Sequence, residues 1–262
     1  MKTLLSIVLG LGACGGSTAQ QSAAESNPAT EEGAAVERTE ASNETPGGLR
    51  LLDFVVMRDG YGPEDRARYT TQVQRIARDH GVTLEQSYRV EQAMNGEVQP
   101  VLDFNIWQVP APEALGALGE DPRYQALVEM RDRIHDMTKL TLYLAEPTVS
   151  GDQLTSNHVL VDLVFLNEGK TLEDRAAYGR LIGPIAQRHG LRRVQSYRVL
   201  QHLGGLGNGA VELNLWEVDD PSALQATLTD PEYQSHVPTR NEIHDMERLT
   251  MLLARPNPGG TR

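Results

Sequence analysis

The chain has 262 residues, enough for one large or two small domains, and its 24 basic and 36 acidic residues give a formal charge of −12. This acidic balance excludes nucleic acid and anionic membrane surfaces as electrostatic partners, because both need a basic protein face. The single cysteine, Cys14, excludes an internal disulfide, and no apolar run is long enough for a mature membrane-spanning helix.

The opening segment MKTLLSIVLGLGACGG has the layout of a signal peptide, with Lys2 before a short apolar run and then small residues. The tetrad from Leu11 to Cys14 resembles the lipobox of bacterial lipoproteins. The resemblance implies cleavage before Cys14 and acylation of that cysteine. Because Gly15 and not an aspartate follows, it also implies the outer membrane, facing the periplasm. We therefore expect a lipoprotein signal peptide at 1–13; the alternative is an ordinary secretory signal with a chance cysteine.

Residues 14–49 are rich in Ser, Ala, Glu, Thr and Gly and contain no aromatic side chain. Such a segment cannot bury enough apolar surface to offset the conformational entropy of its chain. We expect a disordered tether that holds the folded part away from the membrane, so that the lipid anchor is the only membrane contact.

An internal repeat follows the tether. Residues 51–147 align on residues 160–256 without a gap, so that IHDMTKLTLYLAEP returns as IHDMERLTMLLARP and HGVTLEQSYRVEQ as HGLRRVQSYRVLQ. A tandem repeat predicts two copies of one structural unit. The expected organisation assigns repeat one to 50–148, a polar linker to 149–157, repeat two to 158–257 and a tail to 258–262.

Each repeat is predicted to have the order β-α-β-β-α-β. In repeat one, an apolar strand at 51–58 precedes a helix from Pro63 to about His80, which Gly81 terminates. A second strand at 84–92 and a third at 101–109 flank a turn marked by Asn95-Gly96.

The dipeptide Asp121-Pro122 has the form of a helix N-cap followed by proline at the first helical position. The second helix should run from there to about His135, before a strand at 140–145. In repeat two, glycines and Pro184 predict a kink or break in the first helix, and Pro238 predicts an interruption of the second.

The element order and the pattern W-x-V…A-L…D-P-x-Y-Q…R resemble the ferredoxin-like fold as the dimeric α/β-barrel superfamily uses it. In that superfamily two sheets meet face to face, usually across a dimer, and a tandem repeat can supply both halves. The resemblance implies an α+β fold in which two ferredoxin-like βαββαβ repeats pack sheet to sheet as a pseudo-dimeric α/β barrel. A sheet with helices on one face leaves its other face bare, which favours this packing.

Side chains alternate along the strands, and we assign the wholly apolar face to the helices and the polar face to the barrel lumen. The lumen is then expected to collect eight ligand-binding candidates: Asp53, Arg89, Asn105, Trp107, Asp162, Arg198, Asn214 and Trp216. Because buried charge needs a partner, Arg89 should pair with Asp53, and the matching arginine of repeat two with its aspartate.

This cluster has two interpretations: a pocket with an aromatic wall for a small organic molecule, or a salt-bridged barrel centre without a ligand. Asn and Trp on barrel strands also resemble the cofactor-independent monooxygenases of the superfamily, which implies oxidation of an aromatic compound as the alternative function. We favour ligand binding or an interaction module over catalysis and expect no cofactor. An envelope protein remains open as a partner, bound by outer helices or strand edges.

Four of the seven histidines fall in two pairs at aligned positions of the repeats. His80 and His189 precede the glycine that ends the first helix, where an imidazole favours the helix dipole. His135 and His244 end the second helix, where a general base is conceivable. No spacing resembles a metal site, so no metal is expected. Four tyrosines on helix faces are interpreted as core: Tyr69, Tyr124, Tyr178 and Tyr233.

Overall fold

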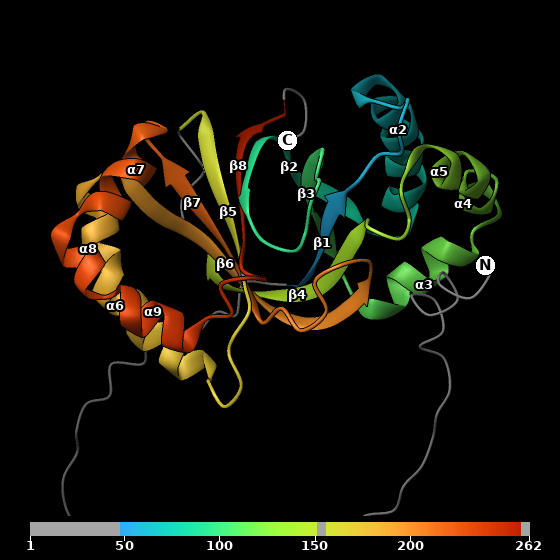
Figure 1. Ribbon diagram of the computed structural model, residues 1–262. Helices are drawn as coiled ribbons and strands as arrows, with labels where there is room; N and C mark the ends of the chain where they lie inside the picture. The colour runs from blue at the N-terminus through green and yellow to red at the C-terminus, as the bar shows by residue number, and fades with distance from the viewer. Residues whose placement is uncertain (1–47, 151–155, 258–262) are drawn as a thin grey trace, which may run out of the picture.

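The computed structural model of the protein describes residues 48–150 and 156–257. The expected signal peptide at 1–13, Cys14 with nearly all of the tether, the middle of the linker and the tail at 258–262 lie outside these residues. Within them the chain has an α+β fold around a closed, eight-stranded antiparallel barrel, with helices on two opposite sides (Figure 1). Among the described helices, none has the length and apolar character needed to cross a bilayer.

Repeat one supplies four strands and four helical segments. They are β1 (Leu49–Val55), α2 (Pro63–Asp79), β2 (Thr83–Asn95), β3 (Asp103–Val109), α3 (Pro112–Glu120), α4 (Pro122–Gln125), α5 (Val128–Ile134) and β4 (Thr141–Ser150). Strand β4 thus continues two residues into the range expected to be linker.

Repeat two follows the same order. Its elements are β5 (His158–Val164), α6 (Leu172–Arg188), β6 (Leu191–Gly204), β7 (Glu212–Val218), α7 (Ser222–Thr229), α8 (Pro231–Ser235), α9 (Val237–Ile243) and β8 (Thr250–Pro256).

The local signals in the sequence explain these boundaries. Asp65 accepts a hydrogen bond from the Gly62 backbone N–H at the start of α2 (3.1 Å), and Gly81 follows its end with φ 73°. Asp121 caps α4 by accepting from the Arg123 N–H (2.8 Å), as predicted. The turn at Asn95-Gly96 is confirmed as well, because β2 ends at Asn95 and Gly96 has φ 104°.

Three expectations about the helices need correction. Helix α3 was missed, because Gly116 and Gly119 weaken the helical signal of PEALGALGE. Its counterpart α7 was missed as well, although SALQATLT contains no glycine. Helix α6 is not broken; it runs unbroken through Pro184 for 17 residues. The interruption at Pro238 is present, but repeat one is interrupted between α4 and α5 too, so the proline fits a break that the fold already has.

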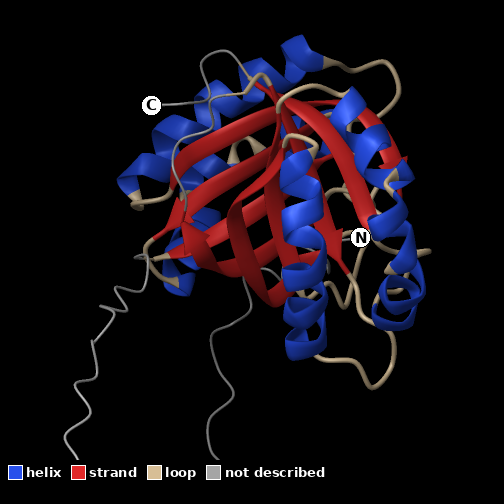
Figure 2. Cartoon of the chain, turned by 90° about the vertical axis from the view of Figure 1, so that its left-hand side faces the viewer, coloured by secondary structure: helices blue, strands red, loops and turns tan. Residues whose placement is uncertain are grey.

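The strands close in the order β1-β3-β2-β8-β5-β7-β6-β4, with every pair antiparallel. Within repeat one the order is therefore β4-β1-β3-β2, and repeat two has the matching order β8-β5-β7-β6. The halves join where β2 pairs with β8 and where β4 pairs with β6. Figure 2 shows the strands curving around the barrel with helices outside them.

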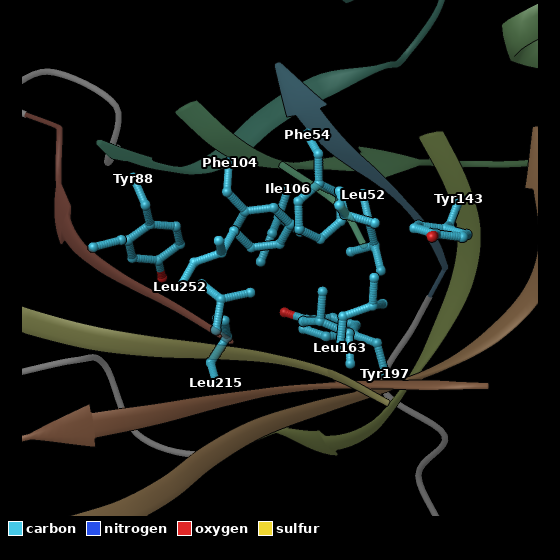
Figure 3. Packing of buried hydrophobic residues seen from close by; sticks show 14 of the residues in the cluster. Leu52, Phe54, Tyr88, Phe104, Ile106, Tyr143, Leu163, Tyr197, Leu215 and Leu252 are labelled. Atoms are coloured by element: carbon cyan, nitrogen blue, oxygen red, sulfur yellow. The ribbon is translucent and has the colours of Figure 1, made fainter. Parts of the chain in front are cut away.

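The barrel interior is an apolar core, and this reverses the expected assignment of strand faces. Leu52, Phe54 and Phe104 from repeat one and Leu163 and Leu215 from repeat two are fully buried and point toward one another between the strands (Figure 3). The polar face with its tryptophans meets the helices instead. An eight-stranded barrel is just wide enough for side chains to fill it, and apolar groups fill it without needing polar partners.

Two glycines at equivalent positions allow the backbones of the two repeats to approach closely. A Cβ on Gly96 would overlap the backbone of Thr250, and a Cβ on Gly205 would overlap the backbone of Leu140 and Thr141. Both glycines have positive φ, 104° and 87°. The hydroxyl of Thr250 also accepts the N–H of Val98 (3.1 Å), so each β-hairpin closes against the other repeat.

Candidate functional site

A cavity of about 140 Å³ lies in repeat one between the outer face of the sheet and the helices. We call it the Trp107 pocket. Its walls are mainly apolar, and its polar lining comes from one aspartate, two arginines, two tyrosines, a histidine, a threonine and the indole: Asp53, Arg66, Arg131, Tyr69, Tyr124, His135, Thr70 and Trp107. An apolar cavity near 150 Å³ holds a benzene-sized molecule, so the space suits a single ring or a branched aliphatic group.

Asp53 is the polar centre of the Trp107 pocket, and three groups donate to its Oδ2 atom. Arg66 Nη2 lies at 3.0 Å, Asn105 Nδ2 at 3.1 Å and Trp107 Nε1 at 3.4 Å. Burial raises the pKa of Asp53, while Arg66, Asn105 and the indole lower it. The three donors therefore offset part of the cost of burying a carboxylate beneath an apolar cavity, but burial has the larger effect on the pKa.

The register of the strands sets this geometry. Asn105 is the direct cross-strand partner of Asp53 and also of Ser87. The Ser87 hydroxyl donates to Asn105 Oδ1 at 2.7 Å, so the amide nitrogen of Asn105 is turned toward the carboxylate. A row of three side chains on adjacent strands thus fixes the orientation of the buried acid.

His135 is neutral and its tautomer is fixed. Its Nδ1 lies 3.1 Å from the Arg131 carbonyl oxygen, which can only accept, so Nδ1 carries the proton. Nε2 then accepts from Arg66 Nη1 at 3.4 Å. Burial and the neighbouring Arg66 lower the pKa of His135 to about 3. The ring also packs edge-on against Tyr69, with centroids 5.0 Å apart.

Repeat two has a second cavity of about 120 Å³ at the equivalent place, which we call the Trp216 pocket. Seven of its polar lining residues are the aligned counterparts of those in the first pocket: Asp162, Arg175, Arg240, Tyr178, Tyr233, His244 and Trp216. Thr227 also lines this pocket, where repeat one has Leu118. The serine–asparagine hydrogen bond recurs as well, with Ser196 donating to Asn214 Oδ1 at 2.7 Å. Each pocket is lined by helices and strands of its own repeat almost throughout. The helices of the two repeats lie on opposite sides of the barrel (Figure 1).

The polar network of the Trp216 pocket is looser. Both Arg175 Nη2 and Asn214 Nδ2 lie 3.4 Å from Asp162 Oδ2, longer than the equivalent contacts in repeat one. Among the described residues, the Nε atom of Arg175 and the hydroxyl of Tyr178 are buried without a hydrogen-bond partner. Burial lowers the pKa of His244 to about 4, so this histidine is neutral too.

The sequence-predicted site residues divide into three groups. The first group lines the two pockets: Asp53, Trp107, Asp162 and Trp216. The second group, Asn105 and Asn214, donates hydrogen bonds to the two aspartates. Their expected place in the lumen was wrong, because the lumen is the apolar core. The expected pairs with Arg89 and Arg198 were also wrong: Arg89 pairs with Asp103 at 2.6 Å, and Arg198 pairs with Glu146.

The partners of the two aspartates come from helices, and the sequence prediction missed them. Arg66 on α2 and Arg175 on α6 approach from the side opposite the lumen. A signal existed: of the four arginines in PEDRARYTTQVQRIARD, Arg66 alone has an arginine at the aligned position of repeat two. The four tyrosines predicted as core line the pockets.

His80 and His189 lie at the expected capping positions, but each contacts a carboxylate. His80 Nε2 lies 2.9 Å from Asp121 Oδ2, and His189 Nε2 lies 2.8 Å from Asp230 Oδ2. Each contact ties the end of the first helix to the start of α4 or α8. No cluster of three metal-ligating side chains occurs in the ranges 48–150 and 156–257.

The sequence matches no known family model and no curated protein. The fold is similar to solved structures. An anthrone oxidase-like protein shares 13% identity at TM-score 0.51, over 80% of this chain and 91% of its own. A chlorite dismutase variant from Candidatus Nitrospira defluvii shares 13% identity at TM-score 0.50, over 82% and 93%. These likenesses show that the chain shares its overall fold with the two proteins.

Proposed function

We propose that the protein binds small organic molecules in the Trp107 and Trp216 pockets. The observation that carries this proposal is the recurrence of the cavity: both repeats keep an apolar space with a buried Asp–Arg pair, two tyrosines and an indole at aligned positions. A core without a ligand would gain packing energy by filling such spaces, since interiors are otherwise close-packed. Few polar groups around an apolar cavity are typical of ligand sites.

The proposed architecture is a tandem of ferredoxin-like βαββαβ units that form a pseudo-dimeric barrel. The strand orders β4-β1-β3-β2 and β8-β5-β7-β6 support it, as do the symmetric junctions between the halves. Lipobox-like residues ending at Cys14 support a lipid-anchored protein of the bacterial envelope, facing the periplasm of a two-membrane cell. The pockets would then meet ligands in the periplasmic solution.

Binding is tested with phenol and toluene, which are uncharged single-ring probes of the right size. Each pocket has its own reporter, because Trp107 and Trp216 are the two tryptophans of the chain. The single-tryptophan variants Trp107→Phe and Trp216→Phe should each change fluorescence on titration. At a probe concentration of about 100 times Kd, the free energy of unfolding should rise by about 2.7 kcal/mol per site.

Pocket-filling variants provide the control. Leu118 and Leu228 are half-buried and line the Trp107 and Trp216 pockets respectively. Leu118→Phe should abolish the response of Trp107 alone, and Leu228→Phe that of Trp216 alone. If neither tryptophan responds to either probe in the unmodified protein, the ligand-binding function is wrong.

A cofactor-independent monooxygenase acting on an aromatic molecule is the second candidate. It is favoured by the Asn105–Asp53–Trp107 array beneath an aromatic-sized cavity, and by the name of the anthrone oxidase-like protein. The cavity volume favours one ring over three fused rings. Oxygen uptake with a single-ring hydroquinone, measured by electrode and product analysis, tests this candidate. Activity that survives in a folded Asn105→Ala, Asn214→Ala double variant would rule it out.

A further inference from the structure

The two pockets differ in charge, although their linings align. In repeat one, the buried Arg131 donates to Asp132, with Nη2 and Oδ1 2.6 Å apart. In repeat two, Asn241 stands at the aspartate's position and Arg240 Nε donates to its amide oxygen at 3.0 Å. Across the described ranges, Arg240 has no carboxylate within ion-pair distance. Asp132 and Asn241 are both exposed, so this charge difference does not depend on core packing.

The second arginine of each pocket differs in how closely a carboxylate holds it. Arg66 is held by Asp53 at 3.0 Å, whereas Arg175 is shared between Asp162 at 3.4 Å and Glu212 at 4.0 Å. Gly179 stands where repeat one has Thr70, and Arg175 Nη1 lies 3.3 Å from the position a Cβ would take there. A side chain at position 179 would crowd this guanidinium, and the glycine leaves that space open.

Two donors of the Trp216 pocket have no acceptor among the described residues. The Nε of Arg175 and the hydroxyl of Tyr178 are buried and unpartnered within the described part of the chain, and both residues line the Trp216 pocket. They lie three positions apart on α6 and so share one helix face. A buried donor without an acceptor costs free energy that a ligand oxygen would recover. Arg193, whose guanidinium lies 5.9 Å from the Trp216 ring centroid, adds a further positive charge nearby.

From this asymmetry we propose that the Trp216 pocket binds a small carboxylate with an apolar body, whose oxygens accept from Arg175 Nε and Tyr178 Oη near the unneutralised Arg240. The Trp107 pocket, whose arginines each have a carboxylate, takes uncharged molecules. This inference rests on the proposed ligand-binding function and adds the ligand's charge. The cavity of about 120 Å³ limits the apolar body to one ring or a short branched chain.

The test uses protein labelled with 5-fluorotryptophan, which gives one ¹⁹F resonance for each pocket, assigned with Trp107→Phe and Trp216→Phe. The probes are two nearly isosteric pairs, benzoate with benzamide and isobutyrate with isobutyramide. At the Trp216 resonance, each carboxylate should bind about tenfold more tightly than its amide, the ratio expected for one charge-assisted hydrogen bond. At the Trp107 resonance the carboxylate should have no advantage.

Exchanging the aligned surface residues Asp132 and Asn241 gives a matched pair of variants. Asn241→Asp gives Arg240 the partner that Arg131 has, and should weaken carboxylate binding at Trp216 about fivefold while amide binding stays unchanged. Asp132→Asn should give the Trp107 pocket a preference for the carboxylate. Tyr178→Phe should weaken carboxylate binding at Trp216, whereas Tyr69→Phe should leave it unchanged.

The outcomes distinguish failure of the carboxylate preference from failure of the proposed ligand-binding function. Equal affinities for carboxylate and amide at Trp216, or a carboxylate preference that Asn241→Asp leaves intact, overturn the inference, while amide binding at either resonance keeps the ligand-binding function. No shift of either resonance with any probe overturns both.

Discussion

Arg66 Nη2 and Asp53 Oδ2 lie 3.0 Å apart in a buried ion pair that joins helix α2 to the outer face of strand β1. Both side chains are almost completely shielded from solvent. Such a pair adds little net stability when intact, because desolvation of the two charges offsets their attraction. Breaking it is costly, because one charge remains buried alone.

Removal of this arginine should therefore destabilise the fold strongly. Arg66→Met keeps the length of the side chain, and we expect the free energy of unfolding at pH 7 to fall by about 3–5 kcal/mol in urea titrations. Arg68→Met on the exposed face of α2 is the control and should change it by less than about 0.5 kcal/mol. The deficit should shrink at acid pH, where Asp53 becomes protonated; a pH-independent deficit would point to lost packing alone.

Acid should destabilise the protein through its two buried histidines. The pKa of His135 is lowered to about 3 and that of His244 to about 4, from 6.5. Between those values and pH 6.5 the unfolded chain binds protons that the folded chain does not, so stability is present above pH 6.5 and is lost as pH falls. The slope approaches about 1.4 kcal/mol per pH unit for each histidine.

Urea titrations at pH 7, 6 and 5 measure this slope. The raised pKa of Asp53 and Asp162 acts in the opposite direction, since the folded state then holds those protons more tightly. The substitutions His135→Gln and His244→Gln isolate the histidine contribution and should flatten the slope between pH 6.5 and 5. An unchanged slope in the double variant would contradict the assignment.

The glycines at the junctions between the repeats predict a steric effect. Gly96→Ala and Gly205→Ala should each lower the free energy of unfolding by more than about 2 kcal/mol, because a methyl group would overlap the backbone of the other repeat. Gly60 has a similar positive φ but open space around its Cβ position. Gly60→Ala therefore measures the backbone strain alone, about 1 kcal/mol. Equal losses at Gly60 and Gly96 would count against close packing at the junction.

The anchor has an independent test. Cys14→Ser removes the thiol that the lipobox resemblance assigns to acylation. We expect the protein to leave the membrane fraction and appear in the soluble envelope fraction, because multiple acyl chains anchor firmly. Immunoblots of the two fractions decide the question. A variant that stays in the membrane fraction would show that another contact holds it there.

Local sequence signals predicted much of this fold, and failed where both faces of a strand are buried. The repeat, the strand order in the chain and the caps at Gly81 and Asp121 follow from local chemistry. On β3, by contrast, Phe104, Asn105, Ile106 and Trp107 are all buried. Alternation separates these residues into two faces but does not say which face is inside. The partner of Asp53 was missed for the same reason, because it lies on the helix that covers the outer face.

The closure of the barrel constrains how this protein can meet another. Every strand of the described chain is hydrogen-bonded on both sides, β2 to β8 and β4 to β6 included. No strand edge is left there for a second chain to extend by adding a strand of its own. Copies brought close together, as the proposed lipid anchor would bring them, would therefore resist edge-to-edge association. A protein partner, if one is recruited, would have to recognise the helical flanks.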